Sequence, residues 1–321
     1  MKSFLKKRLS QRNINRLRIL LKAYDEIKAT IPKMNESFYK PIPVEHLKKE
    51  LIQMGIASGD TIFLAASLNK LLFGGKKTVE KELDFSPIKY ASDVLNMVFE
   101  IIGVDGTIIM NTESGLSQIA IAKIWAGVES DYIFNIKMHT GRGLIAELLR
   151  RKKGGIRSCY PFYNATAFGK NAEYLIKDHM KCSPYFMDEN SPWYKLINLK
   201  AKGILLGNKF LNANILIYTL ECKYKDDFPR PVFHNRPSKV LYIDNDGLQK
   251  DIEIFMLSKY AHNTTSIKNY GDYLIDKYPL YKIKEFSNNC FINVFDIESQ
   301  LKIMEDEMKM NVTCHDPQFW Y

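Results

Sequence analysis

Residues 59–68, GDTIFLAASL, place a Gly-Asp turn directly before a short run of apolar and β-branched residues. Such a pair is typical of a turn, and an apolar run of this length is typical of a buried strand. The preceding stretch, VEHLKKELIQMGI at 44–56, carries its apolar residues at helical spacing. A helix that leads through a turn into a buried strand is a building unit of α/β domains. The stretch therefore predicts α/β architecture.

The alternation of helix and strand continues along the chain. Helices are expected for DVLNMVFEIIG at 93–103, which ends at a glycine, and for GRGLIAELLRRKKGG at 141–155, which has a basic end and a glycine stop. Buried strands are expected for TIIMNT at 107–112 and AKGILLG at 201–207. ANILIYTLE at 213–221 is expected to be an apolar strand that runs into a helix. This pattern predicts one α/β domain.

Two later stretches extend the expected organisation. KVLYIDNDGLQKDIEIFML at 239–257 has alternating apolar residues on both sides of an Asp-Gly pair, which is the pattern of a β-hairpin. NCFINVFDIESQLKIMEDEMKMN at 289–311 is expected to be mostly helical. The domain is assigned to residues 41–321, after a proline-containing entry segment.

Composition limits the classes of protein to be considered. The chain has 321 residues, of which 46% are hydrophobic, so it is long enough to bury a large core. It has no run of about 18 or more apolar residues, which predicts no membrane-spanning helix. The five cysteines are scattered and form no CxxC pair. This pattern favours a reduced cytoplasmic protein and argues against a structural zinc site.

Positive charge is concentrated at the N-terminus. The formal net charge is +10, and residues 1–24 contain eight Lys and Arg residues and no acidic residue. The rest of the chain is therefore close to neutral, which argues against a nucleic-acid-binding domain. Residues 1–40 are expected to form a basic amphipathic helical segment that packs on the domain or on a second copy in a homodimer. An alternative interpretation is peripheral contact of residues 1–24 with an anionic inner membrane surface.

The order of several short strings resembles a known family. The strings are GDTIFLAASL, VDGTIIMNT, GLIAELLRR, GGIRSCYPFYNATAFGKNAEYLIKDH, SPYFMDENSPWYKL, GILLG and NILIYTLE. In this order and spacing they resemble the landmarks of the aminoglycoside 3-N-acetyltransferase family over about residues 44–300. The resemblance implies a single α/β domain with a central mixed sheet flanked by helices. It also implies an N-acyltransferase that acts on an amino sugar, with acetyl-CoA or another acyl-CoA as co-substrate.

The sequence departs from the family pattern at three histidines. The family's loop of Arg, Ser, a variable residue, His and Pro corresponds to residues 157–161, where Tyr160 replaces the histidine. A strand-end histidine corresponds to Ala65, and a histidine three residues before a glutamate corresponds to Tyr218, before Glu221. Acyl transfer to a protonated amine needs a base, and tyrosine, with a pKa of about 10, is poorly suited to that task. Glu221 is therefore the expected base.

The resemblance implies roles for several residues of this chain. Those expected to be catalytic are Glu221, Tyr218 and Tyr160. Those expected to bind the cofactor, with Gly74 and Gly75 nearby, are Ser67, Arg157 and Ser158. Those expected on the substrate side are His179 and Glu189. Arginine suits phosphate recognition, which supports the role expected for Arg157. For His179 the alternative is a structural role in which its ring is hydrogen-bonded inside the protein.

Two functions from different classes remain open. The first is acyl transfer from acyl-CoA to an amino sugar, which includes nucleotide-linked sugars destined for a surface polysaccharide. The second is a family member that binds a sugar or acyl-CoA, or acts as a scaffold, without turnover, because the three histidines are absent. A minor alternative is a Cys159 thiolate, activated by Arg157 or His179, that takes the acyl group first.

Overall fold

The computed structural model describes residues 41–73, 86–125, 131–182, 184–210, 214–257, 264–287 and 290–320. The expected basic segment at 1–40 lies outside the described residues, and so do Gly74 and Gly75. Within the described ranges, no helix has the length and apolar character needed to cross a membrane.

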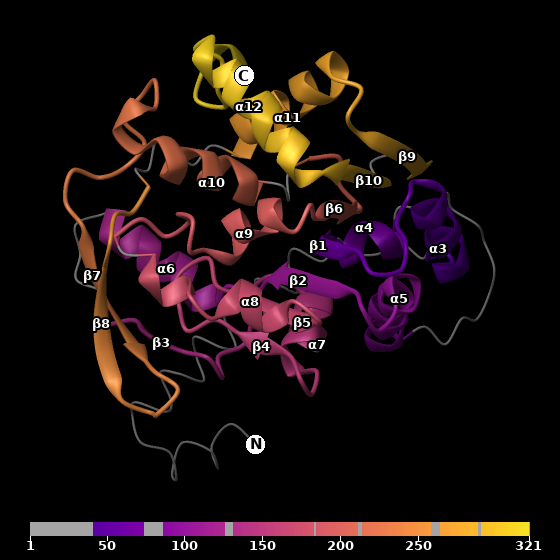
Figure 1. The fold of residues 1–321 in the computed structure, drawn as a ribbon, viewed down its shortest axis with the longest axis horizontal. Coiled ribbons are helices and arrows are strands. Elements are labelled where there is room, and N and C mark those ends of the chain that lie inside the picture. The colour runs from indigo at the N-terminus through magenta and orange to yellow at the C-terminus, as the bar shows by residue number, and fades with distance from the viewer. Residues whose placement is uncertain are drawn as a thin grey trace, which may run out of the picture. The chain divides into compact units, whose positions relative to one another are not determined.

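A seven-stranded mixed sheet forms the centre of the described chain (Figure 1). The parallel strands in its middle are β2 (Thr107–Asn111), β1 (Thr61–Ala66) and β6 (Lys202–Leu206). Antiparallel strands extend the sheet on both sides. They are β5 (Ala165–Gly169) and β4 (Ile156–Arg157) beyond β2, and β10 (Cys290–Asp296) and β9 (Lys282–Ser287) beyond β6. The expected α/β fold with a central mixed sheet is confirmed.

Alternate residues of the central strands point into two separate hydrophobic cores. On β1, Ile62 and Leu64 enter one core, whereas Phe63 and Ala65 contact the other. Because both faces of these strands are buried, their sequences are continuous apolar runs without alternation. This burial explains why the stretch at 59–68 indicates the fold so clearly.

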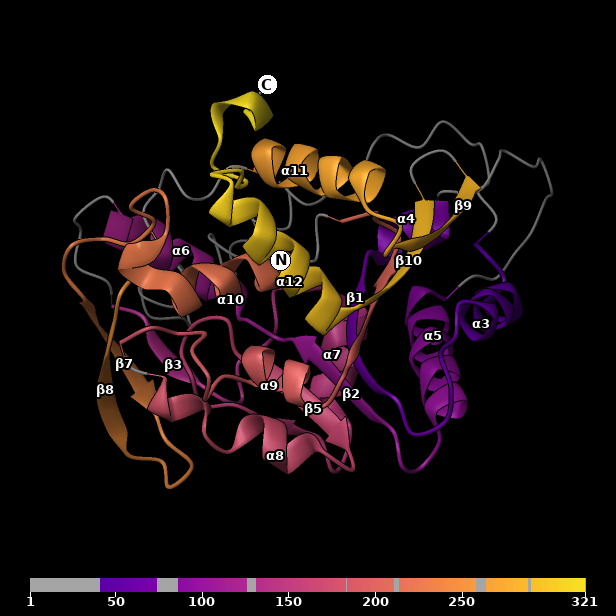
Figure 2. The ribbon, with the colours of Figure 1, turned by 45° about the horizontal axis from the view of Figure 1, so that its top comes forward.

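Helices cover both faces of the sheet (Figure 2). The helices on the first core are α3 (Val44–Gln53), α4 (Leu68–Phe73), α5 (Pro87–Ile102) and α7 (Leu144–Arg151). Those on the second core are α6 (Gly115–Trp125), α8 (Ala172–Ile176), α9 (Pro192–Asn198), α10 (Asn214–Tyr224), α11 (Thr264–Lys277) and α12 (Ile297–Lys309). Helix α12 packs against α10 and α9, so the C-terminal part of the chain covers the second core.

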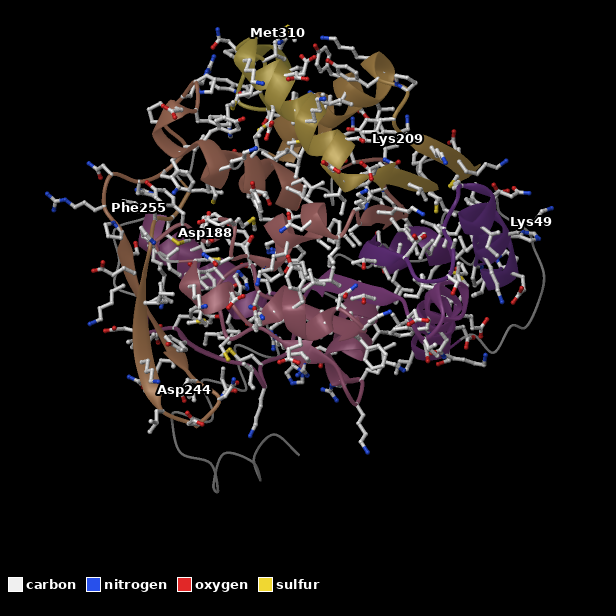
Figure 3. The ribbon with its side chains drawn as sticks, in the orientation of Figure 1. Lys49, Asp188, Lys209, Asp244, Phe255 and Met310 are labelled. Carbon is white, nitrogen blue, oxygen red and sulfur yellow. The ribbon has the colours of Figure 1, made fainter. Side chains whose placement is uncertain are left out.

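The expected hairpin is present in a second, three-stranded sheet. Strand β7 (Ser238–Ile243) pairs antiparallel with β8 (Gln249–Ile254), and β3 (Ile133–Asn135) lies parallel to β7 on its other side. Figure 3 shows Asp244 at the end of the hairpin. Gly247 in the turn has φ 81°, in the left-handed region that favours glycine.

Two expectations about local structure are right about a helix and wrong about the residues before it. Residues 214–221 contain no strand, because α10 begins at Asn214 and covers all of them. Residues 215–222 are all buried, so no alternation of polar and apolar positions reveals the helical period. Residues 290–296 form strand β10 and not a helix, and only α12 after them is helical. Asp296 marks the change, since its side chain accepts a hydrogen bond from Ser299 N and caps α12.

Helix α10 is enclosed by the second core. A helix that is apolar on all sides is stable only inside a protein. Its polar residues Tyr218 and Glu221 therefore project into the interior, where they are 4% and 0% exposed. Burial of a carboxylate is unfavourable without a partner, so Glu221 needs a hydrogen-bonding group from another part of the chain.

Helix α12 is tied to α11 and the turn after it through the buried carboxylate of Glu307. Lys277 Nζ (2.7 Å) and Tyr273 OH (2.7 Å) donate hydrogen bonds to it, and so does Tyr278 OH. Burial acts to raise the pKa of Glu307, but these donors outweigh burial and lower it. The C-terminal segment after α12 therefore starts from a well-anchored helix end.

Glu307→Gln should lower the free energy of unfolding by about 1–3 kcal/mol at neutral pH, because charge-assisted bonds to a buried acceptor are weakened. The difference should shrink in acid. A carboxyl whose pKa is lowered by folding adds stability above its unfolded value of about 4.3, and this stability is lost as the pH falls through the folded value. Urea unfolding across this pH range measures both effects.

The matched control is Asp306→Asn on the same helix, which removes an exposed carboxylate paired with Lys309. It should change the free energy of unfolding by less than about 0.5 kcal/mol. Equal stability of Glu307→Gln and the wild-type protein at neutral pH would show that the buried carboxylate does not anchor α12.

Candidate active site

The buried carboxylate of α10 has its partner in the C-terminal segment. Oε1 of Glu221 lies 2.6 Å from Nε2 of His315, a buried residue 94 positions further along the chain. The other oxygen, Oε2, is buried and has no hydrogen-bond partner among the described residues. A histidine that the sequence did not single out therefore lies beside the expected site residue Glu221.

Backbone and ring contacts hold His315 in place. Its carbonyl accepts a hydrogen bond from Arg230 Nη1 (2.9 Å), and its N–H donates to Thr313 Oγ1 (3.3 Å). Its ring meets Phe228 edge-on, with the ring centroids 5.9 Å apart. Together with the anchored end of α12, these contacts restrict the imidazole to one place beside α10.

The Glu221–His315 pair has the chemistry of a proton acceptor. Burial raises the pKa of Glu221, and the hydrogen bond with His315 opposes the rise. An ionised carboxylate can only accept, so Nε2 of His315 then carries the proton and Nδ1 presents a lone pair. A carboxylate in this position fixes the tautomer and stabilises the imidazolium that forms when Nδ1 takes a proton.

The same place holds a set of atoms that could ligate a metal. One oxygen of Glu221, Sγ of Cys314 and a ring nitrogen of His315 lie within 4.8 Å of one another. Zinc bonds of about 2.0 Å would separate a nitrogen and an oxygen ligand by roughly 3.3 Å. The observed separation is 2.6 Å, which is a hydrogen bond. Burial also raises the pKa of Cys314, so its sulfur stays protonated in this arrangement.

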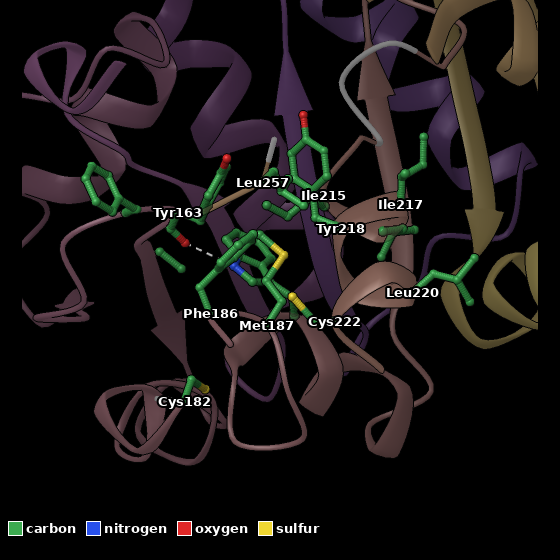
Figure 4. Close-up of a cluster of buried hydrophobic side chains, with 14 of the residues drawn as sticks. Tyr163, Cys182, Phe186, Met187, Ile215, Ile217, Tyr218, Leu220, Cys222 and Leu257 are labelled. Carbon is green, nitrogen blue, oxygen red and sulfur yellow. Dashed lines mark hydrogen bonds between the residues drawn. The ribbon is translucent and has the colours of Figure 1, made fainter. Parts of the chain in front are cut away.

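Two tyrosines lie next to Glu221. Tyr218, one turn earlier on α10, accepts a hydrogen bond at its hydroxyl from Asn214 Nδ2 (3.2 Å). Its ring meets Tyr163 edge-on at 5.4 Å, and Figure 4 shows both hydroxyls on the same side of the apolar cluster. Burial raises the pKa of both phenols, and the charge of Glu221 adds to the rise. Both therefore stay protonated near neutral pH.

Tyr163 has a backbone conformation that favours glycine, with φ 51°. Its N–H donates to Glu113 Oε1 (3.3 Å), and its carbonyl accepts from Trp193 Nε1 (3.0 Å). Its ring stacks on Phe186 with the centroids 4.5 Å apart. The surroundings thus impose a conformation that the residue disfavours, as is common at functional sites.

An ion pair with a buried carboxylate lies next to Tyr163. Glu113, which follows β2, is 1% exposed and pairs with Nη2 of Arg142, which precedes α7. Arg142 is close enough for its charge to act on the hydroxyls of Tyr163 and Tyr218. Two carboxylates, each with a nitrogen partner, therefore lie near the two tyrosines. We call these six residues the polar cluster: Glu113, Arg142, Tyr163, Tyr218, Glu221 and His315.

Tyr160, which replaces the family's loop histidine, packs as a core residue. It is fully buried, its hydroxyl donates to the carbonyl of Cys182 (2.8 Å), and its ring stacks on His179 at 4.5 Å. Burial raises its pKa well above the ordinary value. Its hydroxyl is thus committed to the backbone, and its expected catalytic role stays a prediction.

His179 and Ser158 form a buried hydrogen-bond chain. A carbonyl can only accept, so Nε2 of His179 donates to Phe186 O (3.3 Å) and Nδ1 accepts from Ser158 Oγ (2.9 Å). Burial lowers the pKa of His179 to about 3, so its imidazole is neutral. The geometry favours the structural interpretation of His179. The cofactor-binding role of Ser158 stays a prediction, and its hydroxyl is used inside the protein.

Arg157 ties several segments together. Its guanidinium donates to the carbonyls of Thr112 (2.6 Å), Ile136 (2.7 Å) and Met138, and to Oδ1 of Asn164 (3.0 Å). Burial lowers its pKa to about 10, which is still far above neutral pH. The donors that would contact a phosphate are engaged internally, so the cofactor-binding role of Arg157 also stays a prediction.

The other expected residues lie in different surroundings. Ser67 directly follows β1, and its N–H donates to Leu206 O of β6 (2.8 Å), at the carboxyl ends of the parallel strands, where open α/β folds bind ligands. Glu189 is exposed. Cys159 Sγ lies 3.1 Å from Asn245 Oδ1, and burial raises its pKa, which disfavours the thiolate alternative.

Contacts join the expected residues in two groups. Tyr218 and Glu221 belong to the polar cluster, whereas Tyr160 and Ser158 meet at His179. The residues of the polar cluster that sequence reasoning did not identify are Glu113, Arg142, Tyr163 and His315. A signal existed for the last of them, because one of only six histidines in the chain stands in the string TCHDP at 313–317.

Tyr160→Phe separates a packing role from a catalytic one. It removes only the hydroxyl that donates to Cys182 O, so the free energy of unfolding should fall by about 0.5–1.5 kcal/mol. Turnover of acetyl-CoA with an amine should change by less than about twofold, because a packing residue adds nothing to transition-state binding. Urea unfolding and thiol release measure the two effects. A large loss of turnover at unchanged stability would show that Tyr160 has a catalytic role.

Comparison with known proteins assigns the chain to a family. A family model described as aminoglycoside 3-N-acetyltransferase matches residues 85–301. Among solved structures, AAC-IIIb in a binary complex with CoASH matches with a TM-score of 0.62 and 16% identity, over 84% of this chain and 97% of that one. AAC-VIa bound to sisomicin matches with a TM-score of 0.61 and 15% identity, over 85% and 99%.

The YokD protein from Bacillus subtilis also matches, with a TM-score of 0.59 and 17% identity, over 83% of this chain and 98% of that one. At such identities the structures show a shared fold, and the family model carries the assignment. The resemblance inferred from the order of the sequence strings is thereby confirmed. The chain belongs to the aminoglycoside 3-N-acetyltransferase family.

Proposed function

We propose that the protein transfers an acetyl group from acetyl-CoA to the amine of an amino sugar, and that Glu221 and His315 accept the proton of that amine. The observation that carries the proposal is the 2.6 Å hydrogen bond between a buried imidazole and the carboxylate at the family's glutamate position. The C-terminal segment thus supplies a base that is missing at Ala65, Tyr160 and Tyr218. Acetyl-CoA is the co-substrate of the family's reaction, and the AAC-IIIb complex with CoASH supports this choice.

The proposed reaction needs no acyl-enzyme. The amine nitrogen attacks the thioester carbonyl carbon, and the bond between that carbon and sulfur breaks. Nδ1 of His315 takes the proton that the nitrogen loses, while Glu221 stabilises the imidazolium through Nε2–H. The proton then passes to the coenzyme A thiolate, so the products are an amide and a free thiol. A general base of this kind contributes about 10²- to 10⁴-fold to the rate.

The remaining expected residues receive roles that agree with their contacts. The cofactor is proposed to lie along the carboxyl ends of the parallel strands, where Ser67 is found. Arg157 and Ser158 are proposed to shape this edge through their internal hydrogen bonds. His179 is proposed to be structural. Glu189 is proposed to face the amino sugar, because an exposed carboxylate can accept hydrogen bonds from hydroxyl or ammonium groups.

The biological setting is a further part of the proposal. The acceptor is proposed to be a precursor of a surface polysaccharide, and the protein is proposed to work in the cytoplasm. The basic residues at 1–24 support contact with the anionic inner surface of a membrane, since each Lys or Arg near such a surface adds about 1 kcal/mol. A homodimer formed through this segment is the alternative use of the same residues.

A second candidate function is binding without turnover. The observation that favours it is the burial of Tyr160, whose hydroxyl is tied to Cys182 O at the family's loop-histidine position. In this case the protein would hold a sugar or acyl-CoA, and Glu221 and His315 would only stabilise the second core.

Glu221→Gln should lower kcat by about 10²- to 10⁴-fold with little change in affinity for acetyl-CoA, because it removes the charge that stabilises the imidazolium. His315→Gln should have an effect of similar size. The double variant should be no worse than either single variant, since the two residues act as one unit. Thiol release with a panel of amino sugars gives kcat, and calorimetry gives the affinity for acetyl-CoA.

The matched control is Glu298→Gln, which removes an exposed carboxylate on α12 and should leave kcat unchanged. Tight binding of acetyl-CoA by wild-type protein, with no thiol release for any amine, would favour the binding function. Full activity of a folded Glu221→Gln variant would refute the proposed base.

A further inference from the structure

Arg142 is a member of the polar cluster that the proposed reaction does not use. Its Nη2 donates to the buried carboxylate of Glu113, whereas its Nε is buried and has no hydrogen-bond partner among the described residues. The side chain as a whole keeps 31% of its surface exposed, so Arg142 lies at the boundary between the interior and the surface. A buried N–H without a partner is unfavourable, and an acceptor atom on a ligand would relieve it.

The turn that carries Arg142 is firmly held. Thr140 Oγ1 (3.1 Å) and Gly141 N (2.7 Å) both donate to the carbonyl oxygen of Glu113. A Cβ at Gly141 would lie 2.7 Å from the backbone of Gly115, so the turn packs closely on the start of α6. The backbone on one side and the Glu113 carboxylate on the other therefore set the direction of the guanidinium.

The space next to this turn is open and lies at the start of a helix. Gly143 has φ 94°, and no atom lies within 4 Å of the place that a Cβ would take. Helix α7 begins directly after Gly143, and the N-terminus of a helix favours negative charge. Arg142, the open position at Gly143 and the first residue of α7 are thus consecutive in the chain.

Arg142 is also near the proposed reaction centre. Its partner Glu113 accepts a hydrogen bond from the N–H of Tyr163 (3.3 Å), and the ring of Tyr163 meets that of Tyr218 at 5.4 Å. Tyr218 in turn lies one helical turn before Glu221. A group held by Arg142 would therefore lie close to the amine that loses its proton to the Glu221–His315 pair.

We propose that Arg142 binds an anionic oxygen of the acceptor sugar, a phosphate or a carboxylate, an inference that rests on the proposed function of the polar cluster. The acceptor is then an anionic amino sugar, such as an amino-sugar phosphate or a nucleotide-linked amino sugar. A guanidinium has only donors, so it pairs with oxygen acceptors and cannot pair with the ammonium groups of a polycation. Charge-assisted bonds to an anion are about twice as strong as neutral ones.

Coenzyme A is the other source of phosphate oxygens. Its long pantetheine arm separates the phosphates from the thioester, whereas Arg142 lies beside the tyrosines next to Glu221, where the thioester would react. The geometry therefore favours the acceptor as the owner of the anionic oxygen.

The test compares glucosamine with glucosamine 6-phosphate as acceptors for the full-length protein. Wild-type protein should have the lower KM for the phosphate, measured by thiol release from acetyl-CoA. Arg142→Gln should raise the KM for glucosamine 6-phosphate by about 10- to 100-fold and change that for glucosamine by less than about twofold. Arg142→Lys, which keeps the charge but loses the planar fork, should fall between the two.

Lys153→Gln, which removes an exposed positive charge beyond α7, is the matched control and should leave both KM values unchanged. If Arg142→Gln fails to fold because Glu113 loses its partner, the neutral pair Glu113→Gln with Arg142→Gln should show the same rise in KM. Equal losses of kcat/KM for both sugars would assign Arg142 to the oxyanion of the thioester and overturn the proposal. Weaker binding of acetyl-CoA would assign it to the coenzyme A phosphates, and a wild-type preference for the polycation sisomicin would also overturn it.

Failure of the proposed function can be told apart from failure of this inference. If no amine releases thiol, calorimetry of glucosamine 6-phosphate with wild-type protein and Arg142→Gln still tests the anion contact. Binding that is about 10- to 100-fold weaker in the variant supports the contact, whereas equal affinity, or no binding by wild-type protein, overturns it.

Discussion

The arrangement around the second core depends on one buried carboxylate. Helix α10 is apolar on all sides and must be enclosed, yet it carries Glu221. A buried charge is strongly unfavourable unless a partner and hydrogen bonds compensate for it. His315 provides that partner, so the C-terminal segment has to return over α10. Glu307, held by the end of α11, keeps α12 in the position from which this return is possible.

The same physical problem occurs a second time at Glu113. There the partner is Arg142, which comes from a turn before α7. Each carboxylate therefore contacts a segment that is distant in sequence. The rings of Tyr163 and Tyr218 meet edge-on near both pairs. The polar cluster is consequently both a structural junction and a concentrated set of titratable groups.

The sequence predicted the fold better than the site, for a physical reason. Strand β1 and helix α5 follow local rules of burial, turn and capping, so their residues alone indicate their structure. Where burial is complete, as in α10, periodicity is lost and the helix start was misread. Tyr218 and Glu221 could be placed together because they lie one turn apart on the same helix.

His315 could not be placed beside Glu221, because only tertiary packing brings these residues together. For Arg157 the sequence suggested a contact with a ligand, whereas the folded structure uses its donors internally. A guanidinium in a loop suggests phosphate binding from sequence, but its donors here are used on the carbonyls of Thr112 and Ile136. A side chain's chemical type is visible in the sequence, whereas the number of its donors left for a ligand depends on the folded surroundings.

The long sequence separation within the Glu221–His315 pair has a consequence for biosynthesis. A nascent chain can form its central strands while much of the polypeptide is still in the ribosome, because domains begin to organise from the N-terminus. Until residue 315 has emerged, however, Glu221 has no imidazole to pair with, and α10 cannot be enclosed without an unmatched charge. Chains that stop early would therefore keep an apolar helix accessible to chaperones and proteases. One hydrogen bond thus makes synthesis of the chain as far as residue 315 a condition for both stable folding and the proposed activity.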